Sequence, residues 1–344
     1  MTLAVASIIP RRWPLVAALS ALFLAGGAVG AWSVNLPYYA FSGGPVGDAL
    51  AAVAVEDAEI YLPEGAMIML TVSGQEVNFF EALAAGFDSD IDLVPAAAVR
   101  PPDQTDEEFV LRNRSLMDTS TQTAITLALQ RLGYEITPVS DGIRVAELVD
   151  GTPAAAALQV DDVILRVDGQ PVILVEDLAP IVTSRDIGET IALDVRRADA
   201  EVAVEVELVP RSDDPERAMI GISAETLNPR FEFPFPITIE AGQIGGPSAG
   251  MMYTLAVMDL LSPDDLTGGR VIAGTGTIDL AGNVGAIGGI RQKVVAAEAA
   301  GAEFMLVPAA NFEEASTARR ADMQLVSVAT LDEALEFLGS LANV

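Results

Sequence analysis

A serine in a glycine-rich turn and a distant lysine are the residues of this chain best suited to do chemistry. Ser248 lies in the turn 245–250, Gly-Gly-Pro-Ser-Ala-Gly, directly before the apolar helical stretch 251–261, and Lys293 opens another helical stretch, 293–300. The chain has no His and no Cys, and Lys293 is the single lysine among 19 basic residues. Unlike a guanidinium, a lysine amine can lose its proton near neutral pH when it is withdrawn from water. The pair therefore indicates a serine nucleophile activated by a neutral lysine.

The residue inventory excludes several other mechanisms. Residues 246–250 fit the G-x-S-x-G elbow of α/β-hydrolases, but that elbow needs a histidine base and the chain has none. Cysteine nucleophiles and zinc sites built on Cys or His are excluded for the same reason. An S-x-x-K arrangement fails because Ile290 stands three residues before the lysine, and Lys293 lacks the glycine pattern of a P-loop. We therefore predict no metal site and no cofactor.

Three motifs, in order along the chain, resemble those of the Lon-type serine–lysine proteases. They are Pro-Ser-Ala-Gly at 247–250, Thr-Gly-Thr-Ile-Asp-Leu-Ala-Gly at 275–282 and Ile-Gly-Gly-Ile-Arg-Gln-Lys at 287–293. The spacing of 45 residues between Ser248 and Lys293 is also similar to that of the family. The resemblance covers the chain from Pro234 to its C-terminus, and three motifs together are a specific signal.

This resemblance implies roles for the residues of the motifs. Ser248 and Lys293 would form a catalytic dyad, and Thr275 would support the dyad by orienting the lysine. A tight turn would let backbone N–H groups converge on an oxyanion, which accounts for three glycines of the turn: Gly245, Gly246 and Gly250.

The sequence also departs from the Lon pattern and allows structural alternatives. Gly245 stands where many Lon enzymes carry an acidic residue, and Arg-Gln at 291–292 replaces a Lys-Glu pair. Ser248 could be only a helix N-cap, Lys293 a solvated helix residue and Thr275 an ordinary strand residue. The placement of the only lysine at the matching position of a matching motif favours the catalytic interpretation.

Residues 143–208 resemble a PDZ domain. The resemblance rests on the pattern G-x-P-A-A at 151–155, followed by D-D-V-I-L-x-V-D-G-x-x-V at 161–172. A helix is predicted at 174–184, and alternating residues predict closing strands at 190–196 and 202–208.

PDZ domains bind extended peptide ends by adding a strand to a sheet edge. The resemblance places this edge at 143–149, with the carboxylate-binding turn just before it. The predicted peptide-binding residues are Asp141, Gly142, Ile143 and Val145. Alternatively, Gly142 serves only a hairpin, and the groove is vestigial or occupied by the chain itself.

The strongly negative net charge of the chain argues against nucleic acid as a partner. The 344 residues include 49 acidic and 19 basic ones, for a net charge of −30, so no basic surface is expected to meet nucleic acid. The absence of cysteine excludes a disulfide-stapled scaffold.

The N-terminal stretch has the features of a membrane anchor. Arg11 and Arg12 precede the span 13–32, which contains no charged residue and has tryptophans at both ends. About 20 apolar residues suffice to cross a bilayer, and the positive-inside rule then places residues 1–12 in the cytoplasm. We predict a transmembrane helix at 13–34, so that the protein is single-pass in the cell membrane with its C-terminal domains extracellular. The alternative is a cleaved signal peptide, because small residues at 25–31 offer a cleavage site.

The sequence as a whole predicts an α+β (mixed α/β) protein with some parallel βαβ character. Residues 50–136, with helices at 79–87 and 119–132 and a loop at 96–108, are expected to pack with the protease domain. The PDZ domain is placed at 137–210 and the Lon-type domain at 220–344.

The whole chain resembles bacterial, membrane-anchored PDZ-containing Lon-like proteins. This implies an ATP-independent serine endopeptidase that acts on unfolded or extracytoplasmic peptide or protein substrates, with the PDZ domain recognising or gating them. Lon-type domains commonly form rings, so a homo-oligomer is suggested as well. The alternative is an inactive adaptor that only binds peptides through its PDZ domain.

Overall fold

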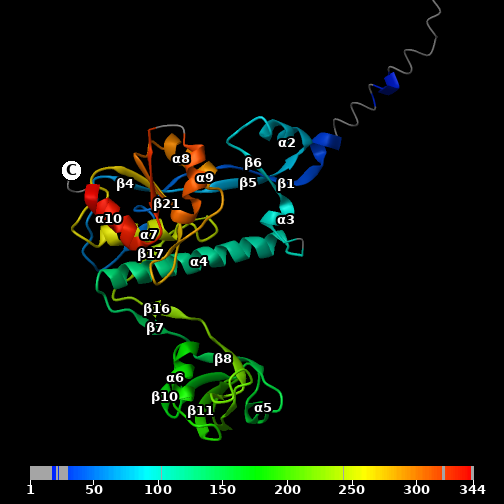
Figure 1. The fold of residues 1–344 in the computed structure, drawn as a ribbon, viewed down its shortest axis with the longest axis vertical. Coiled ribbons are helices and arrows are strands. Elements are labelled where there is room, and N and C mark those ends of the chain that lie inside the picture. The colour runs from blue at the N-terminus through cyan, green and yellow to red at the C-terminus, as the bar shows by residue number, and fades with distance from the viewer. Residues whose placement is uncertain are drawn as a thin grey trace, which may run out of the picture. The chain divides into compact units, whose positions relative to one another are not determined.

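The computed structural model describes residues 18–20, 22, 30–101, 103–242, 244–319 and 322–341 (Figure 1). The chain divides into two compact units. The first unit joins Met1–Ala128 to Ile237–Val344, and the second unit is Leu129–Pro236. The first unit holds the serine turn and the lysine, and the second holds the PDZ-like pattern.

The main sheet of the first unit has the strand order β2-β4-β18-β21-β22. Its strands are β2 (Gly47–Asp48), β4 (Ala66–Met69), β18 (Val271–Gly274), β21 (Phe304–Pro308) and β22 (Gln324–Val328). The last four are parallel, and β2 is antiparallel to β4. Four of the five residues of β21 are buried, as expected for a parallel strand that is covered on both faces.

Helices cover both faces of this sheet. Gly274 of β18 approaches Met252 of α7 (Gly250–Leu260), whereas the preceding Ala273 packs with α8 (Ile290–Ala299) and α9 (Phe312–Ala318). Since successive strand residues point to opposite faces, α7 lies on one face and α8 and α9 on the other. A short 3₁₀ turn, η2 (Ala309–Asn311), precedes α9, and α10 (Leu331–Leu341) follows β22.

A smaller antiparallel sheet lies nearer to the N-terminus. It consists of β1 (Asn35–Gly43), β5 (Val72–Asn78) and β6 (Asp92–Pro95), in the order β5-β1-β6. Two short helices follow its strands, α2 (Phe79–Ala85) and α3 (Ala96–Val99). Two-strand ribbons join β3 (Val53–Val55) to β17 (Ile237–Ile239), and β19 (Thr277–Ile278) to β20 (Val284–Gly285).

The longest of the described helices, α4 (Asp106–Arg131), has 26 residues. It begins with a capping box, in which Thr105 N–H donates to the Glu108 carboxylate and Glu108 N–H donates to the Thr105 hydroxyl. Its second half is buried through residues such as Ala124, Ile125 and Leu129. The helix starts in the stretch 96–108 that we expected to be a loop, and it extends 13 residues further toward the N-terminus than predicted.

The second unit is a mostly antiparallel domain around one core. Its sheet has the order β12-β11-β9-β8-β15, and β10 pairs with β9. The strands are β8 (Ile143–Leu148), β9 (Val163–Val167), β10 (Gln170–Pro171), β11 (Thr190–Arg197), β12 (Ala200–Glu207) and β15 (Ile222–Thr226). The helices are α5 (Pro153–Ala157), η1 (Val175–Asp177) and α6 (Leu178–Thr183). Short ribbons pair β13 (Val209–Pro210) with β14 (Ala218–Met219) and β7 (Thr137–Val139) with β16 (Arg230–Glu232).

The mixed α/β fold is as predicted, but one domain boundary is wrong. The Lon-type domain was expected to begin at 220, whereas β15 at 222–226 pairs with β8 and belongs to the PDZ-like sheet. The PDZ-like unit therefore extends well beyond residue 210.

The predicted transmembrane helix, 13–34, falls mostly on residues outside the described part of the chain, as does the N-terminal segment 1–12. Among the helices that the structure does describe, none has both the length and the apolar character needed to cross a bilayer.

Candidate active site

Ser248, Lys293 and Thr275 come together at the centre of the first unit. Ser248 lies two residues before α7, Lys293 in the first turn of α8, and Thr275 directly after β18. The Lys293 Nζ atom lies 2.8 Å from Ser248 Oγ and 2.8 Å from Thr275 Oγ1. The structure thus brings together all three residues that the Lon-like motifs single out.

Burial makes the lysine amine unusually acidic. Lys293 is 1% exposed, and no carboxylate in the described part of the chain forms an ion pair with it. Because a buried ammonium loses its hydration without a compensating charge, its pKa falls from 10.5 to about 8. A substantial fraction of the amine is therefore neutral at mildly alkaline pH.

Thr275 determines how the amine is oriented. Its hydroxyl donates to the Ser248 backbone carbonyl over 3.0 Å, and the Gly276 N–H donates to the same carbonyl over 2.8 Å. With its own proton committed, Thr275 Oγ1 can only accept a hydrogen bond from Lys293. One N–H of a neutral amine thus points to Thr275, which leaves the nitrogen lone pair free to face the Ser248 hydroxyl.

Helix α4 holds the serine turn in place. The Gly246 N–H donates to the Asn113 carbonyl over 2.9 Å, and the Ser120 hydroxyl donates to the Pro247 carbonyl over 3.1 Å. A Cβ at Gly250 would lie 2.7 Å from Ser120 Oγ, and one at Gly245 would lie 3.0 Å from Asn113 Cβ. These glycines are required mainly because α4 packs so closely against the turn.

Two backbone N–H groups of the serine turn are bound to other acceptors. The Gly246 N–H is bonded to Asn113, and the Gly250 N–H donates to the Pro247 carbonyl. By contrast, the N–H groups of Ser248 and Ala249 donate to no acceptor among the described residues. Gly246 does serve the turn through its positive φ of 84°, which favours glycine.

The dyad opens into a cavity of about 720 Å³. Ser248 and Lys293 line one side, and the other side is mostly apolar, with Phe41, Val72 and Val99 among its residues. A second cavity of about 610 Å³ shares these three residues and continues toward Phe109 on α4. An extended apolar segment of a substrate would fit such a surface.

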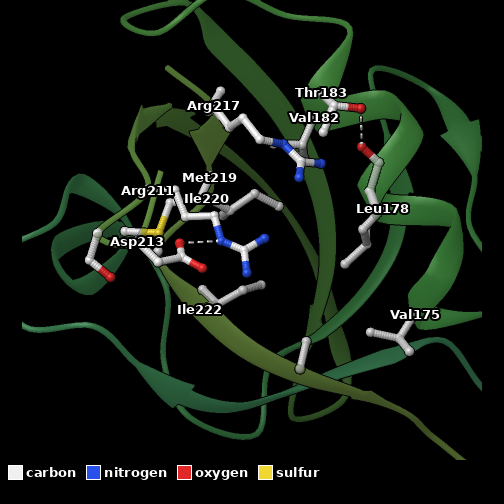
Figure 2. A pocket seen from close by; sticks show the side chains of 15 residues that line it. Val175, Leu178, Val182, Thr183, Arg211, Asp213, Arg217, Met219, Ile220 and Ile222 are labelled. Carbon is white, nitrogen blue, oxygen red and sulfur yellow. Dashed lines mark hydrogen bonds and ion pairs between the residues drawn. The ribbon is translucent and has the colours of Figure 1, made fainter. Parts of the chain in front are cut away.

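A separate cavity of about 670 Å³ lies in the second unit, between α6 and the strands β14 and β15 (Figure 2). Leu178 and Val182 of α6 form one wall, and the opposite wall contains Met219 and Ile222. Figure 2 shows the guanidinium groups of two further lining residues, Arg211 and Arg217, extending from the strand side toward α6. Arg211 Nε donates to the Asp213 carboxylate over 2.6 Å.

The edge strand beside this cavity is β15, and not the predicted strand 143–149. Because β8 lies between β9 and β15, both of its edges are paired, and its residues Ile143 and Val145 are fully buried. Asp141 binds Asn228 and Arg230, and Gly142 N–H donates to Ser140. These residues are therefore structural, and Gly142 is required because a Cβ there would clash with β9.

Sequence reasoning missed β15 because this strand lies outside the stretch that carries the PDZ motif. The run Met219-Ile220-Gly221-Ile222 offers a signal, since apolar residues surround a glycine whose φ is 92°. A Cβ on Gly221 would also meet the Thr152 side chain at 2.8 Å.

Comparisons with known families agree with both units. Residues 237–339 match the Lon protease (S16) C-terminal proteolytic domain, and residues 130–208 match the PDZ domain. The Lon protease of Campylobacter concisus is 29% identical over 140 residues, which are 40% of this chain and 17% of that protein. The Lon protease of Clostridioides difficile is 39% identical over 94 residues, 26% of this chain and 12% of that protein. This chain thus spans less than a fifth of the length of either relative.

Parts of solved structures are also similar to about a quarter of this chain. The PDZ domain of an SdrC-like protein from Listeria monocytogenes is 24% identical, with a TM-score of 0.23, and the match covers 24% of this chain and 87% of that one. A solution structure from Geobacillus thermodenitrificans is 26% identical, with a TM-score of 0.23, and covers 24% of this chain and 94% of that one.

The first unit combines a match to the Lon C-terminal proteolytic domain with a buried serine–lysine pair, and no histidine occurs in the sequence. The chain thus contains one region similar to a Lon-type proteolytic domain and one region similar to a PDZ domain.

Proposed function

We propose that this protein is a membrane-anchored serine endopeptidase that cleaves unfolded segments of peptides or proteins outside the cytoplasm, without nucleotide. The observation that carries the proposal is the 2.8 Å approach of a buried lysine amine to Ser248 Oγ. Ser248 is the nucleophile, Lys293 the general base and Thr275 the residue that orients the base.

The reaction starts with a proton transfer. The neutral Lys293 amine takes the proton of the Ser248 hydroxyl while Oγ attacks the carbonyl carbon of the scissile bond. The resulting ammonium then donates a proton to the leaving amine. In the second half of the reaction, Lys293 deprotonates a water molecule that hydrolyses the acyl ester on Ser248.

The negative charge of the tetrahedral intermediate needs hydrogen-bond donors. The N–H groups of Ser248 and Ala249 meet this requirement, because they have no other acceptor among the described residues and lie at the start of α7. Donors of this kind typically stabilise the transition state by about 3–4 kcal/mol each.

Other sequence features support the cellular setting of the proposal. The proposal of cleavage without nucleotide concerns these 344 residues, in which no P-loop occurs, and it is the reason that we expect unfolded substrates. The uncharged span 13–32 behind Arg11 and Arg12 supports an anchor with its N-terminus in the cytoplasm. A ring-shaped homo-oligomer is also part of the proposal, on the strength of the Lon-like domain alone.

The PDZ unit would bind the ends of substrates. A peptide could add a strand to the free edge of β15, place an apolar side chain between Leu178 and Ile222, and direct its terminal carboxylate to Arg211 or Arg217. This position replaces the groove at 143–149 that the sequence suggested.

A comparison of three proteins tests the enzyme proposal. Wild type, Ser248→Ala and Lys293→Arg are incubated in detergent with an internally quenched, unstructured peptide. We expect both variants to lose at least about 10³-fold in kcat/KM, because one removes the nucleophile and the other replaces an ionisable base by a permanent cation.

Matched far-UV circular dichroism and thermal unfolding of the three proteins verify that they are folded. Wild type that cleaves no better than Ser248→Ala on a panel of unstructured peptides would overturn the proposal. The inactive PDZ adaptor would then be the better explanation, provided that peptides still bind.

A further inference from the structure

The short helix α2 exposes its large apolar side chains to solvent, which is unusual for a helix of a soluble protein. The small residue Ala85 faces inward and is buried, whereas Phe79 and Leu83 are 50% and 52% exposed. A helix that packs on a sheet normally turns its large apolar residues toward the sheet. A capping box between Asn78 and Glu81 fixes the residue at which the helix starts, and with it the side of the helix on which each residue lies.

The exposed residues of α2 form one continuous surface with the chain that enters β1. Trp32 contacts Phe80 with ring centroids 6.1 Å apart, and Phe80 contacts Phe79 at 5.6 Å. Figure 1 shows α2 beside the start of β1. We call this surface the docking face, and its large residues are Trp32, Val34, Phe79, Phe80, Leu83 and Phe87.

We propose that the docking face inserts into the interface of a lipid bilayer, next to the point where the chain leaves the membrane. This inference rests on the proposed membrane anchor. Phe87 is 86% exposed and Trp32 is 67% exposed, and exposed apolar surfaces of this kind mark interaction sites.

The position of Trp32 identifies the occupant of the docking face. Trp32 is the last residue of the uncharged span 13–32 and also the first residue of the docking face. The docking face therefore directly follows the end of that span. Tryptophan and other aromatic residues favour the interface between acyl chains and headgroups. Among the residues that the structure describes, no other segment combines an exposed apolar helix with an end of a long apolar run.

The charges around the docking face determine which lipids it can meet. No basic residue occurs from 13 to 99, and Glu81 and Asp88 are exposed beside the apolar residues. One guanidinium comes near from another element, since Arg291 donates to the Ser89 carbonyl over 3.5 Å. Because the two carboxylates outnumber this guanidinium, the docking face has no net positive charge that would attract anionic headgroups. The contact must be apolar, so it should form on phosphatidylcholine and be insensitive to salt.

The cysteine-free chain allows a direct test with single nitroxide labels. The full chain is reconstituted into phosphatidylcholine vesicles as Phe87→Cys or, as a matched control, Leu280→Cys, which lies in a turn of the same unit and is 47% exposed. Electron paramagnetic resonance then compares collisions with oxygen, which concentrates in lipid, and with a nickel chelate, which stays in water. We expect the oxygen-to-nickel ratio to be several-fold higher at position 87 than at position 280, at low and high salt.

The outcomes are distinguishable. If the full chain does not float with the vesicles, the proposed membrane anchor is contradicted, and so is the proposed insertion of the docking face. If the chain floats but the label at 87 is as accessible to nickel as the label at 280, the docking face alone is overturned. The label at 87 could also be protected from nickel by a second copy of the chain. If this protection disappears when each vesicle holds one chain or fewer, a second copy rather than lipid covers the docking face, and the proposal is overturned.

Discussion

The buried amine of Lys293 makes a definite prediction for the pH dependence of cleavage. Its pKa of about 8 is lower than that of an exposed lysine because burial penalises the ammonium. Only the neutral amine can accept the proton of Ser248, so log kcat/KM should rise with unit slope below pH 8 and level off above it. At pH 7 the value should be about tenfold below the plateau. Initial rates between pH 6 and 9.5 measure this profile.

A flat profile, or one that falls with pH over the same range, would contradict the assignment of Lys293 as the base. Denaturation must be excluded at each pH by back-titration to pH 8 and recovery of activity. The two side chains that contact the Lys293 amine, Ser248 and Thr275, are hydroxyls and do not titrate in this range.

Thr275 should act through the orientation of Lys293. In Thr275→Val the shape is retained but the acceptor of the Nζ–H group and the donor to the Ser248 carbonyl are lost. We expect kcat to fall about 10- to 100-fold with little change in KM, because a misplaced base impairs the chemical step more than binding. Thr275→Ser keeps the hydroxyl and should recover most of the activity. Equal loss in both variants would indicate a packing role instead.

The three residues of the site could be predicted because their signal is local and chemical. A single lysine at the correct place in a glycine-containing motif is visible in the sequence alone. The roles of individual N–H groups could not be predicted in this way. The Gly246 N–H is bonded by Asn113, a residue more than a hundred positions away on α4, and only the folded chain shows this contact.

At the scale of elements, α4 is the support against which the serine turn is built. Gly250→Ala would push a methyl group to 2.7 Å from Ser120 Oγ and 3.2 Å from Ile278 Cγ2. We expect the free energy of unfolding to fall by about 1–3 kcal/mol and activity to fall with it. Urea denaturation measures the first and peptide cleavage the second.

A double-mutant cycle identifies the cause of that loss. Ser120→Ala removes the nearer obstacle, so Gly250→Ala should cost less in the Ser120→Ala background than in wild type. If the two changes are simply additive, the contact between α4 and the turn does not explain the glycine.

The first half of α4 shows why the sequence predicted this helix only in part. Residues 106–118 are largely exposed, so they show no clear apolar stripe, and the preceding Pro- and acid-rich stretch suggested a loop. The Thr105 and Glu108 pair is the one local signal of the true start, since it matches the capping-box pattern. The buried second half was predicted at 119–132 because its apolar residues recur at helical spacing.

The groove between α6 and β15 makes a prediction about charge. Arg217→Gln removes one positive charge from the cavity, and we expect it to weaken binding of a peptide with a free carboxylate about 3- to 10-fold. Gln170→Glu, on the exposed strand β10, changes the net charge by the same amount outside the cavity and is the matched control. Fluorescence anisotropy with labelled peptides measures both. Equal affinity of wild type for a peptide and its C-terminal amide would contradict a carboxylate site.

At the scale of the whole molecule, the sequence predicted which kinds of domain are present better than where each one ends. The PDZ motif lies within 143–172, but the sheet is completed by β15, which lies beyond the predicted end of the domain at residue 210. Long-range strand pairing of this kind leaves no local pattern. The same applies to the first unit, in which β4 from the N-terminal part pairs in parallel with β18.

The single lysine has a practical consequence for spectroscopy. Reductive methylation with ¹³C-formaldehyde modifies only amines, so the described fold would carry one labelled side chain, on Lys293, in addition to any free α-amino group. An NMR titration of that resonance would then record the protonation of Lys293 without overlap from another labelled side chain, provided that unfolding and refolding give the reagent access to it.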